Sequence, residues 1–397
     1  MRPDVKNKVK VLTFLGYYIP GYKAGGPIRT LANMADHLSE HFEFWIITRD
    51  RDQDESLAYD SVSVNTWQKV GNANVYYLSP DRCTVRGIAR VVDSTPHDLV
   101  YLNSFFDPNF TLKPLLGWKF LKSTDKPIIL APRGEFSEGA LSIKTTKKNI
   151  YIRLCSWIYR GITFHASSQY EKNDSLRNLS WLLDKNIFVA IDLPTKLDQT
   201  HLPPPLPTNP DTSSLRVIFL SRICRMKNLD YALAVLAHVT KNIKLDIYGP
   251  KEDPDYWMEC ESYIRQLPAN IEVSYCGNVM PENVKDTFAS YDLFFFPTKG
   301  ENYGHVVAES ISVGTPVLLS DQTPWRNLEK ENLGWDLSLD DPLLFAKTID
   351  NFASTPKDER QSQRVSVYKK ALEKLSDSTS VELNKELFLS VLKNRKG

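Results

Sequence analysis

The sequence predicts an α/β protein with two doubly wound domains, each built on a parallel sheet covered by helices. Short apolar runs alternate with helical stretches through the first half of the 397-residue chain. A segment rich in Pro, Ser and Thr, residues 196–215, interrupts this alternation, which restarts afterwards. The runs are apolar throughout rather than at every second position, which is typical of strands buried on both faces, as in parallel sheets. The length also suits two or three domains.

The first predicted domain covers residues 1–200. Its expected strands are residues 9–15, 42–48, 74–78, 98–102, 127–131, 162–166 and 187–191. Between the first two, residues 27–40 place Leu31, Met34 and Leu38 on one helical stripe. Pro27 suits the first turn of this helix, because its fixed φ is helical and its missing N–H is not needed there.

The second predicted domain covers residues 216–364, after a linker at residues 201–215. Dense prolines in the linker forbid a helix or a central strand and favour an extended connection. The expected strands of the second domain are residues 216–220, 244–248, 271–276, 293–296 and 316–319. Residues 365–397 follow as a largely helical tail.

Composition excludes several classes of protein. The formal net charge of +1 gives no general attraction to nucleic acid, so no nucleic-acid partner is expected. The five cysteines are scattered and form no C-x-x-C pair, which argues against a disulfide framework and a zinc site. The basic N-terminus lacks the apolar run of a signal peptide, and no apolar run reaches the length of a transmembrane helix. We therefore expect a cytoplasmic protein.

The most informative stretch is KGENYGHVVAESISVG, residues 299–314. Glu301 lies in a glycine-flanked loop that follows an apolar strand, and Glu309 lies in the helix that begins near His305 and ends at Gly314. A loop that leads from a strand into a helix N-terminus suits phosphate, because backbone N–H groups and the helix dipole favour an anion there. Carboxylates repel that anion and suit hydroxyl groups instead. Phosphate and hydroxyls on one ligand indicate a sugar nucleotide.

Residues 294–321, FFFPTKGENYGHVVAESISVGTPVLLSD, resemble the E-x7-E motif of retaining GT-B glycosyltransferases of the family 4 type. The resemblance implies two Rossmann-like domains that face each other across a cleft, with the tail at residues 365–397 crossing back onto the first. It implies Glu301 at the donor sugar hydroxyls, near the reacting carbon, and Glu309 at the ribose hydroxyls. Asn302, Tyr303 and Gly304 are further donor-binding candidates.

The segment SRICRMKNL, residues 221–229, also resembles that family. Arg222 and Lys227 correspond to the basic pair that clamps the donor diphosphate, and both are predicted to be catalytic with Glu301. Charge develops on the leaving diphosphate, where fixed cations stabilise the transition state most. Ser221 and Asn228 depart from the usual glycines without removing a charge. The alternative is that both cations are solvated surface residues.

Glycine-containing loops at other strand ends are weaker matches. Gly25 and Gly26 precede the helix at Pro27 and resemble the loop that approaches the donor diphosphate; the alternative is a plain turn. Gly249 and Val279 follow two strands of the second domain and resemble the loops around the nucleobase.

Candidate acceptor residues lie in the first domain. Arg133, in APRGEFSEG, either binds an acceptor phosphate or is a buried structural arginine. Asn103 stands where many family members have a histidine, and it cannot act as a base. His165 and His305 remain candidates with no assigned role. Retaining enzymes of this fold have no agreed nucleophile, so the resemblance implies front-face attack assisted by a donor phosphate oxygen.

Residues 140–160 predict a basic amphipathic helix. Lys144, Lys147, Lys148, Arg153 and Arg160 occur there with no acidic residue, and aromatic side chains alternate with them. Such a helix can lie on an anionic membrane. The alternative is a helix whose apolar stripe belongs to the core.

The sequence thus predicts a glycosyltransferase with a nucleotide-diphosphate sugar as co-substrate, no other cofactor and no metal. The expected acceptor is a glycan or a lipid-linked molecule of cell-envelope or lipopolysaccharide assembly, met in the cytoplasm or on the inner face of the membrane. One alternative is a GT-B epimerase or sugar-phosphate synthase acting on soluble substrates. Another is a non-catalytic nucleotide-sugar-binding protein, although such a protein is expected to have lost some of its charged site residues.

Overall fold

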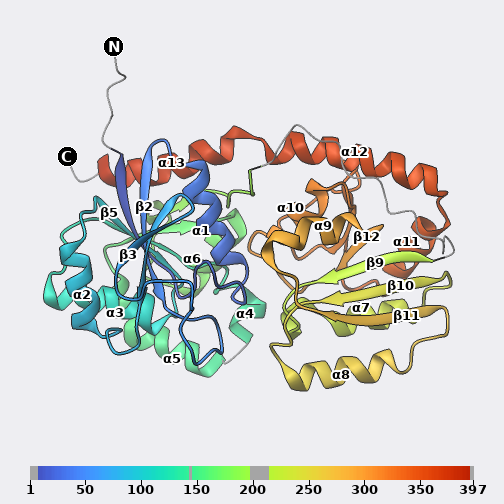
Figure 1. Ribbon diagram of the computed structural model, residues 1–397, viewed down its shortest axis with the longest axis horizontal. Helices are drawn as coiled ribbons and strands as arrows, with labels where there is room; N and C mark the ends of the chain where they lie inside the picture. The colour runs from blue at the N-terminus through green and yellow to red at the C-terminus, as the bar shows by residue number, and fades with distance from the viewer. Residues whose placement is uncertain (1–7, 143–144, 197–213, 394–397) are drawn as a thin grey trace, which may run out of the picture. The chain divides into compact units, whose positions relative to one another are not determined.

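A computed structural model describes residues 8–142, 145–196 and 214–393. The chain folds into two compact units, Met1–Lys196 with Ser378–Gly397, and Leu197–Asp377 (Figure 1). Of the predicted linker, only residues 214 and 215 are described, and Leu215 already begins a strand. Each unit contains one sheet, so the predicted class of two doubly wound α/β domains is confirmed.

The first unit has an eight-stranded sheet with the order β3-β4-β2-β1-β5-β6-β7-β8. Every neighbouring pair is parallel except β3 and β4. Its strands are β1 Val9–Phe14, β2 Phe42–Arg49, β3 Trp67–Val70, β4 Ala73–Leu78, β5 Leu99–Asn103, β6 Ile128–Ala131, β7 Thr163–Ala166 and β8 Ile187–Val189. The expected strands all form within two residues of their predicted ends. Strand β3 was missed because it is a short, partly exposed edge strand with no continuous apolar run.

Helices cover both faces of this sheet. They are α1 Gly26–His37, α2 Val85–Ser94, a π-helix at Pro108–Leu112, α3 Lys113–Leu121, α4 Glu138–Ser142, α5 Thr145–Cys155, a 3-10 turn η2 Ser156–Tyr159, α6 Gln169–Asn178, a 3-10 turn at Asp184–Asn186 and α13 Ser378–Lys393. Apolar residues of α1 and α13 pack on one face of the sheet, and those of α2, α3 and η2 pack on the other.

The second unit has a six-stranded parallel sheet with the order β11-β10-β9-β12-β13-β14. Its strands are β9 Leu215–Leu220, β10 Ile243–Tyr248, β11 Ile271–Gly277, β12 Leu293–Phe296, β13 Val317–Ser320 and β14 Gly334–Leu337. Its helices are α7 Leu229–Leu236, α8 Pro254–Ile264, α9 Val284–Ala289, α10 His305–Ser312, α11 Pro342–Ser354 and α12 Lys357–Leu375, with 3-10 turns at Arg225–Lys227 and Pro281–Asn283. The sequence did not predict β14, which is only partly buried.

The helical tail begins later than expected. Residues 365–375 belong to α12, which packs on the second unit through Val367, Ala371 and Leu375. The buried Arg364 anchors this helix by donating to the carbonyl of Ala289 at 2.8 Å. Only α13 belongs to the first unit, where the Phe388 ring lies 5.3 Å from that of Phe42. The predicted start at residue 365 is wrong because the apolar stripe of α12 continues the core of the second unit.

The strand orders define where ligands are expected. In the first sheet the order reverses between β1 and β5, and in the second it reverses between β9 and β12. In open parallel sheets, ligands bind outside the carboxyl ends of the strands, in the crevice at such a reversal. We therefore expect ligand-binding residues in the loops that follow β1, β5, β9 and β12.

Candidate functional site

The loops after β9 and β12 are tied together at the reversal point of the second sheet. The Asn228 amide donates to the carbonyl of Pro297 at 2.8 Å, and Thr298 Oγ1 donates to that of Met226 at 3.0 Å. Asn228 has a φ of 63°, a left-handed conformation that asparagine tolerates better than most residues. Asparagine thus fills the backbone role for which glycine is usual, and the departure noted in the sequence leaves the loop intact.

This pairing of loops brings two predicted catalytic residues together. The Lys227 ammonium forms an ion pair with the Glu301 carboxylate, and each side chain is only 13% exposed. The Lys227 ammonium also lies 5.6 Å from the centroid of the Phe296 ring. Arg222, on the same loop as Lys227, pairs with Glu252 at 2.7 Å, and both of these side chains are about one third exposed. An exposed pair of this kind is weak, so Arg222 can exchange Glu252 for an anionic ligand at little cost.

The loop after β12 leads directly into the N-terminus of α10. Gly304 is the N-cap with a φ of 81°, and no side chain caps the helix among the described residues. The Trp325 indole donates to the carbonyl of Tyr303 at 2.6 Å, and the Tyr303 ring lies 4.8 Å from that of His305. Residues 302–304 are therefore held next to a helix N-terminus, where the dipole favours an anion.

The two predicted glutamates differ in their surroundings. Glu301 lies in the loop, and Glu309 lies on the second turn of α10 with only 4% of the residue exposed. A glutamate is seldom buried so deeply, because removing a carboxylate from water is costly unless it is engaged. The structure thus places one carboxylate in the loop, paired with a lysine, and the other nearly buried on α10.

Gly249 allows the loops after β9, β10 and β11 to stack. Its φ is 132°, and a Cβ at this position would lie 1.8 Å from the carbonyl oxygen of Ser221. Its N–H donates to the carbonyl of Gly277 at 2.9 Å. Only glycine fits here, so its role is close packing of the strand ends that position Arg222. The Val279 side chain packs on the core of the second unit, which leaves its backbone for any ligand contact.

In the first unit, the glycine-rich loop after β1 is held by an aspartate that the sequence reading missed. Gly25 is the N-cap of α1 with a φ of 73°, and Gly26 is the first residue of the helix. The Asp52 carboxylate accepts hydrogen bonds from the backbone N–H groups of Tyr22 and Lys23 at 3.0 and 3.3 Å. The loop at the reversal point of the first sheet is thus held by hydrogen bonds to a side chain from another segment.

Arg133 lies in a buried polar network. Its side chain is 6% exposed and donates to Asp192 at 2.7 Å, to Asn103 at 2.7 and 3.1 Å and to the Tyr101 hydroxyl at 2.8 Å. These contacts favour the structural interpretation of Arg133, with Asn103 as one of the groups that hold it. Spacing along the chain gives no hint of this network, but its members lie in or just after four successive strands.

His165 belongs to the same network. Its two ring nitrogens contact the Tyr101 hydroxyl at 2.6 Å and the carbonyl of Ala190 at 2.8 Å. Burial, with a further contribution from the nearby Arg133 charge, lowers the pKa of His165 to about 4. Because both ring nitrogens are engaged in this buried network, the contacts favour a structural role for His165.

Glu135, which follows Arg133 in the chain, is expected to make stability depend on pH. Its carboxyl accepts hydrogen bonds from the Ser104 hydroxyl at 2.7 Å and the Phe105 N–H at 2.5 Å, yet burial raises its pKa to about 7 from an ordinary 4.5. The folded state therefore binds the proton more tightly than the unfolded state. The free energy of unfolding should fall by about 3 kcal/mol as the pH rises from about 4.5 through 7.

Urea unfolding at several pH values tests this expectation. Glu135→Gln should flatten the dependence between pH 4.5 and 7, because the amide does not titrate. The exposed Glu40→Gln in the same unit serves as the control and should keep the wild-type slope. Parallel pH profiles for wild type and Glu135→Gln would contradict the assignment.

Residues 140–160 do not form the single helix that was predicted. Residues 138–142 are α4, residues 145–155 are α5, and the 3-10 turn η2 completes the segment. The chain leaves α-helical geometry after Cys155 as Ile158 and Tyr159 enter the core. Lys144 lies outside the described residues. Lys148 turns inward, donating to the carbonyl of Ala140 at 2.6 Å.

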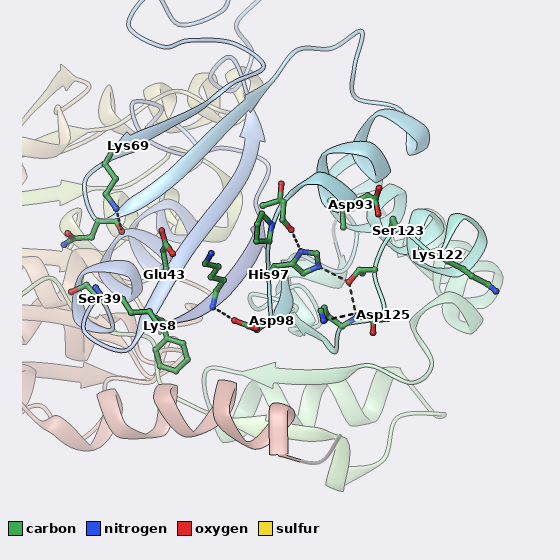
Figure 2. Close-up of a pocket in the computed structure, with 18 residues that line it drawn as sticks. Lys8, Ser39, Glu43, Lys69, Asp93, His97, Asp98, Lys122, Ser123 and Asp125 are labelled. Carbon is green, nitrogen blue, oxygen red and sulfur yellow. Dashed lines mark hydrogen bonds and ion pairs between the residues drawn. The ribbon is translucent and has the colours of Figure 1, made fainter. Parts of the chain in front are cut away.

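A large hollow lies elsewhere in the described part of the chain, at the amino ends of the strands of the first sheet (Figure 2). It has a volume of about 1150 Å³, and its lining includes Lys8, Glu43, His97 and Asp98. Acidic and basic side chains are mixed there, and His97 is already bonded to Thr95 and Thr124. Because ligands of parallel sheets bind at the carboxyl ends, we do not assign the candidate site to this hollow.

In residues 8–142, 145–196 and 214–393, no group of three or more His, Cys, Asp or Glu side chains could hold a metal ion. No helix in this part of the chain is both long and apolar enough to cross a membrane.

Known proteins share this fold and part of this sequence. Residues 207–370 match the family model described as glycosyl transferases group 1. An uncharacterized glycosyltransferase of Methanocaldococcus jannaschii is 28% identical over 106 residues, a match that covers 26% of each protein. The chain thus matches about a quarter of that relative's length.

Solved structures agree over nearly the whole chain. HepE from Anabaena, in complex with UDP and glucose, superposes with a TM-score of 0.69 and 13% identity over 96% of this chain and 99% of its own. Sucrose-phosphate synthase from Thermosynechococcus elongatus superposes with a TM-score of 0.66 and 15% identity, over 96% of this chain and 100% of its own. The lipopolysaccharide outer core galactosyltransferase WaaB superposes with a TM-score of 0.60 and 15% identity, over 96% of this chain and 99% of its own. The predicted GT-B fold is confirmed.

Proposed function

Because residues 207–370 match the glycosyl transferases group 1 family and the fold is GT-B, we propose that the chain is a retaining, metal-independent glycosyltransferase of the family 4 type. It transfers a sugar from a nucleotide-diphosphate sugar to a glycan or lipid-linked acceptor. The observation that carries this proposal is the joining of the β9 and β12 loops, which sets Lys227 against Glu301 beside the N-terminus of α10.

The donor occupies the carboxyl edge of the second sheet. Its diphosphate lies at the N-terminus of α10 and is clamped by Arg222 and Lys227, which stabilise the charge that grows as the glycosidic bond breaks. Glu309 binds the ribose hydroxyls, and Glu301 binds the sugar hydroxyls near the reacting carbon. Within the second unit, the backbone around Gly249 and Val279 contributes further donor contacts.

In the reaction, the bond between the anomeric carbon and the diphosphate oxygen breaks while the acceptor oxygen bonds to the same face of that carbon. The acceptor hydroxyl proton passes to the departing phosphate oxygen, so no protein nucleophile is needed. The Lys227 ammonium pairs with Glu301 in the chain without donor and turns to the diphosphate when the donor arrives, where its charge stabilises the leaving group.

Two observations bear on the acceptor. The sequence resembles cell-envelope polysaccharide enzymes, and WaaB, a lipopolysaccharide galactosyltransferase, shares the fold. We place the enzyme in the cytoplasm or on the inner face of the membrane, with the first unit binding the acceptor near the network of Arg133 and Asn103. HepE is solved with UDP-glucose, which makes UDP-sugars the first donors to test.

A panel of UDP-, GDP-, ADP- and dTDP-sugars tests the proposal by thermal shift. A ligand at 100 times its dissociation constant adds about 2.7 kcal/mol of stability. We expect one nucleotide class to raise the melting temperature, by roughly 2–4 °C for each kcal/mol in a domain of this size.

Product analysis then separates the alternatives. With the binding donor and an acceptor, NMR should show the donor's anomeric configuration preserved, with or without EDTA. An inverted product would contradict the retaining mechanism, and loss of activity in EDTA would contradict metal independence. Conversion of a soluble sugar phosphate would identify a synthase, and conversion of the donor alone would identify an epimerase. Binding of a donor without turnover of any acceptor would favour the non-catalytic alternative.

A further inference from the structure

Large apolar side chains are exposed on two neighbouring segments of the first unit, α5 together with η2, and the end of α3. Ile150 and Leu154 of α5 are 54% and 65% exposed, and Trp157 of η2 is 49% exposed. Phe120 and Leu121, at the end of α3, are 64% and 45% exposed. The rings of Phe120 and Trp157 meet edge to face with centroids 5.9 Å apart, so the two elements form one surface. We call these five residues the α3–α5 patch.

The patch is separate from the core-facing side of α5. Tyr151, Ile152 and Cys155 pack partly buried on the core of the first unit, and Ile158 and Tyr159 are buried there. Ile150 and Leu154 are four residues apart and Trp157 follows three later, so all three lie on the opposite side of this segment. The segment therefore has two apolar stripes, and core packing accounts for only one of them.

Basic residues surround the patch. Arg153 and Arg160 are exposed beside its α5 half, Lys147 is exposed one turn before Ile150, and the exposed Lys122 follows Leu121. No Asp or Glu occurs within residues 113–124 or 145–160. Lys148 is not counted, because it donates into the fold. The surface thus combines exposed aliphatic and aromatic side chains with positively charged ones.

We propose that the α3–α5 patch docks this chain on an anionic lipid bilayer. Aliphatic and aromatic side chains enter the headgroup region, where tryptophan is favoured, while the surrounding cations meet lipid phosphates. A second copy of the chain is a poor occupant, because self-association through this surface would bring its cations together. The proposal rests on the proposed function only in giving a lipid-linked acceptor a reason to lie nearby. It replaces the predicted single helix with a surface to which α3 contributes Phe120 and Leu121.

Vesicle co-sedimentation of the full chain tests this proposal. Binding is expected to phosphatidylcholine vesicles that contain phosphatidylglycerol, to fade with added salt, and to be much weaker on phosphatidylcholine alone. Equal binding to both compositions would overturn the electrostatic part of the proposal. No binding to either at low salt, or a stable dimer of the wild type in place of binding, would overturn it altogether.

Two double variants locate the surface. Phe120→Ser with Leu154→Ser should lower vesicle partitioning about a hundredfold, since two large apolar side chains no longer enter the lipid. Lys147→Glu with Arg153→Glu should lower it by a similar factor or more, at about fivefold for each unit of charge. The matched controls lie on α11, where Leu343 is 61% exposed and Lys347 is exposed, so Leu343→Ser with Lys347→Glu should bind as wild type does.

Nucleotide binding separates this proposal from the proposed function. All three double variants should bind UDP as wild type does by calorimetry, because every change lies outside the candidate donor site. Loss of vesicle binding with intact UDP binding supports the patch. Vesicle binding that persists in both patch variants would overturn the assignment of the surface whatever the donor proves to be.

Discussion

Lys227→Ala is expected to lower turnover about a hundredfold or more while the fold remains intact, and Arg222→Ala should do the same. Both side chains follow β9 at the reversal point of the second sheet, where the diphosphate is proposed to lie. A fixed donor of charge or hydrogen bonds at the site of developing negative charge is worth about 10²–10³ in turnover. The measurement is kcat and KM with the donor that the thermal-shift panel identifies.

The two variants should differ in their effect on stability. Lys227 and Glu301 are both 13% exposed, so removing the ammonium leaves a largely buried carboxylate without its ion pair. Such a loss costs more than the loss of an exposed pair. Arg222 and Glu252 are much more exposed, and Arg222→Ala should leave the melting temperature nearly unchanged. Lys227→Arg is a useful intermediate, because it keeps the charge but not the compact ammonium.

Arg225→Ala is the matched control for both variants. Arg225 lies on the same loop, but it pairs with Glu259 at 2.9 Å and stacks over Tyr256, with more than half of its side chain exposed. Its loss removes the same charge from the same loop and should change turnover little. Wild-type turnover in both Arg222→Ala and Lys227→Ala would rule out the diphosphate assignment. An equal loss in Arg225→Ala would show that only the net charge of the loop matters.

Most strands could be predicted because buried strands contain runs of consecutive apolar residues, which can be recognised in the sequence. Leu293–Phe296 and Ile128–Ala131 are apolar at every position, as expected for interior strands that are covered by helices on both faces. The edge strands β3 and β14 lack this signal, because they are half exposed and their residues satisfy no continuous pattern. These two strands form because they pair with β4 and β13, respectively. Such pairing depends on another segment, so the residues of β3 and β14 alone do not predict it.

The candidate donor-site residues could be proposed from sequence because the loops that carry them are continuous segments. Arg222 and Lys227 share one loop, and Glu301 and Glu309 share one loop and helix. Contacts between segments could not be read in the same way. The ion pair of Lys227 with Glu301 joins residues 74 positions apart. Arg133 was left open for the same reason, since its partners on β5 and after β8 come together only when the sheet forms.

Glu309→Gln and Glu301→Gln are expected to have opposite effects on binding and transfer. Glu309, nearly buried on α10, is proposed to hold the ribose hydroxyls, so its amide variant should weaken binding of free nucleoside diphosphate about 10–100-fold. Glu301 is proposed to hold the donor sugar hydroxyls. Glu301→Gln should therefore spare the binding of free nucleoside diphosphate, which has no sugar at that position, and lower transfer by roughly the same factor.

The ion pair between Lys227 and Glu301 sharpens the prediction for UDP binding to Glu301→Gln. Without a ligand, the Lys227 ammonium pairs with Glu301, so the carboxylate is expected to compete with an arriving diphosphate for that ammonium. Removing the carboxylate charge frees that ammonium, so UDP should bind Glu301→Gln at least as tightly as it binds wild type. Calorimetry with UDP measures binding, and turnover at saturating donor measures transfer. The exposed Glu329→Gln, in the same unit, is the control and should match wild type in both.

The two readouts separate a functional role from a structural one. A purely structural Glu301 would lower UDP binding and transfer together, since Lys227 would lose its position when the carboxylate is neutralised. A purely structural Glu309 would lower stability without a selective loss of UDP binding. If Glu301→Gln weakens UDP binding while Glu309→Gln spares it, the carboxylates have been assigned to the wrong ends of the donor. The glutamate beside Lys227 would then be the one that holds the ribose.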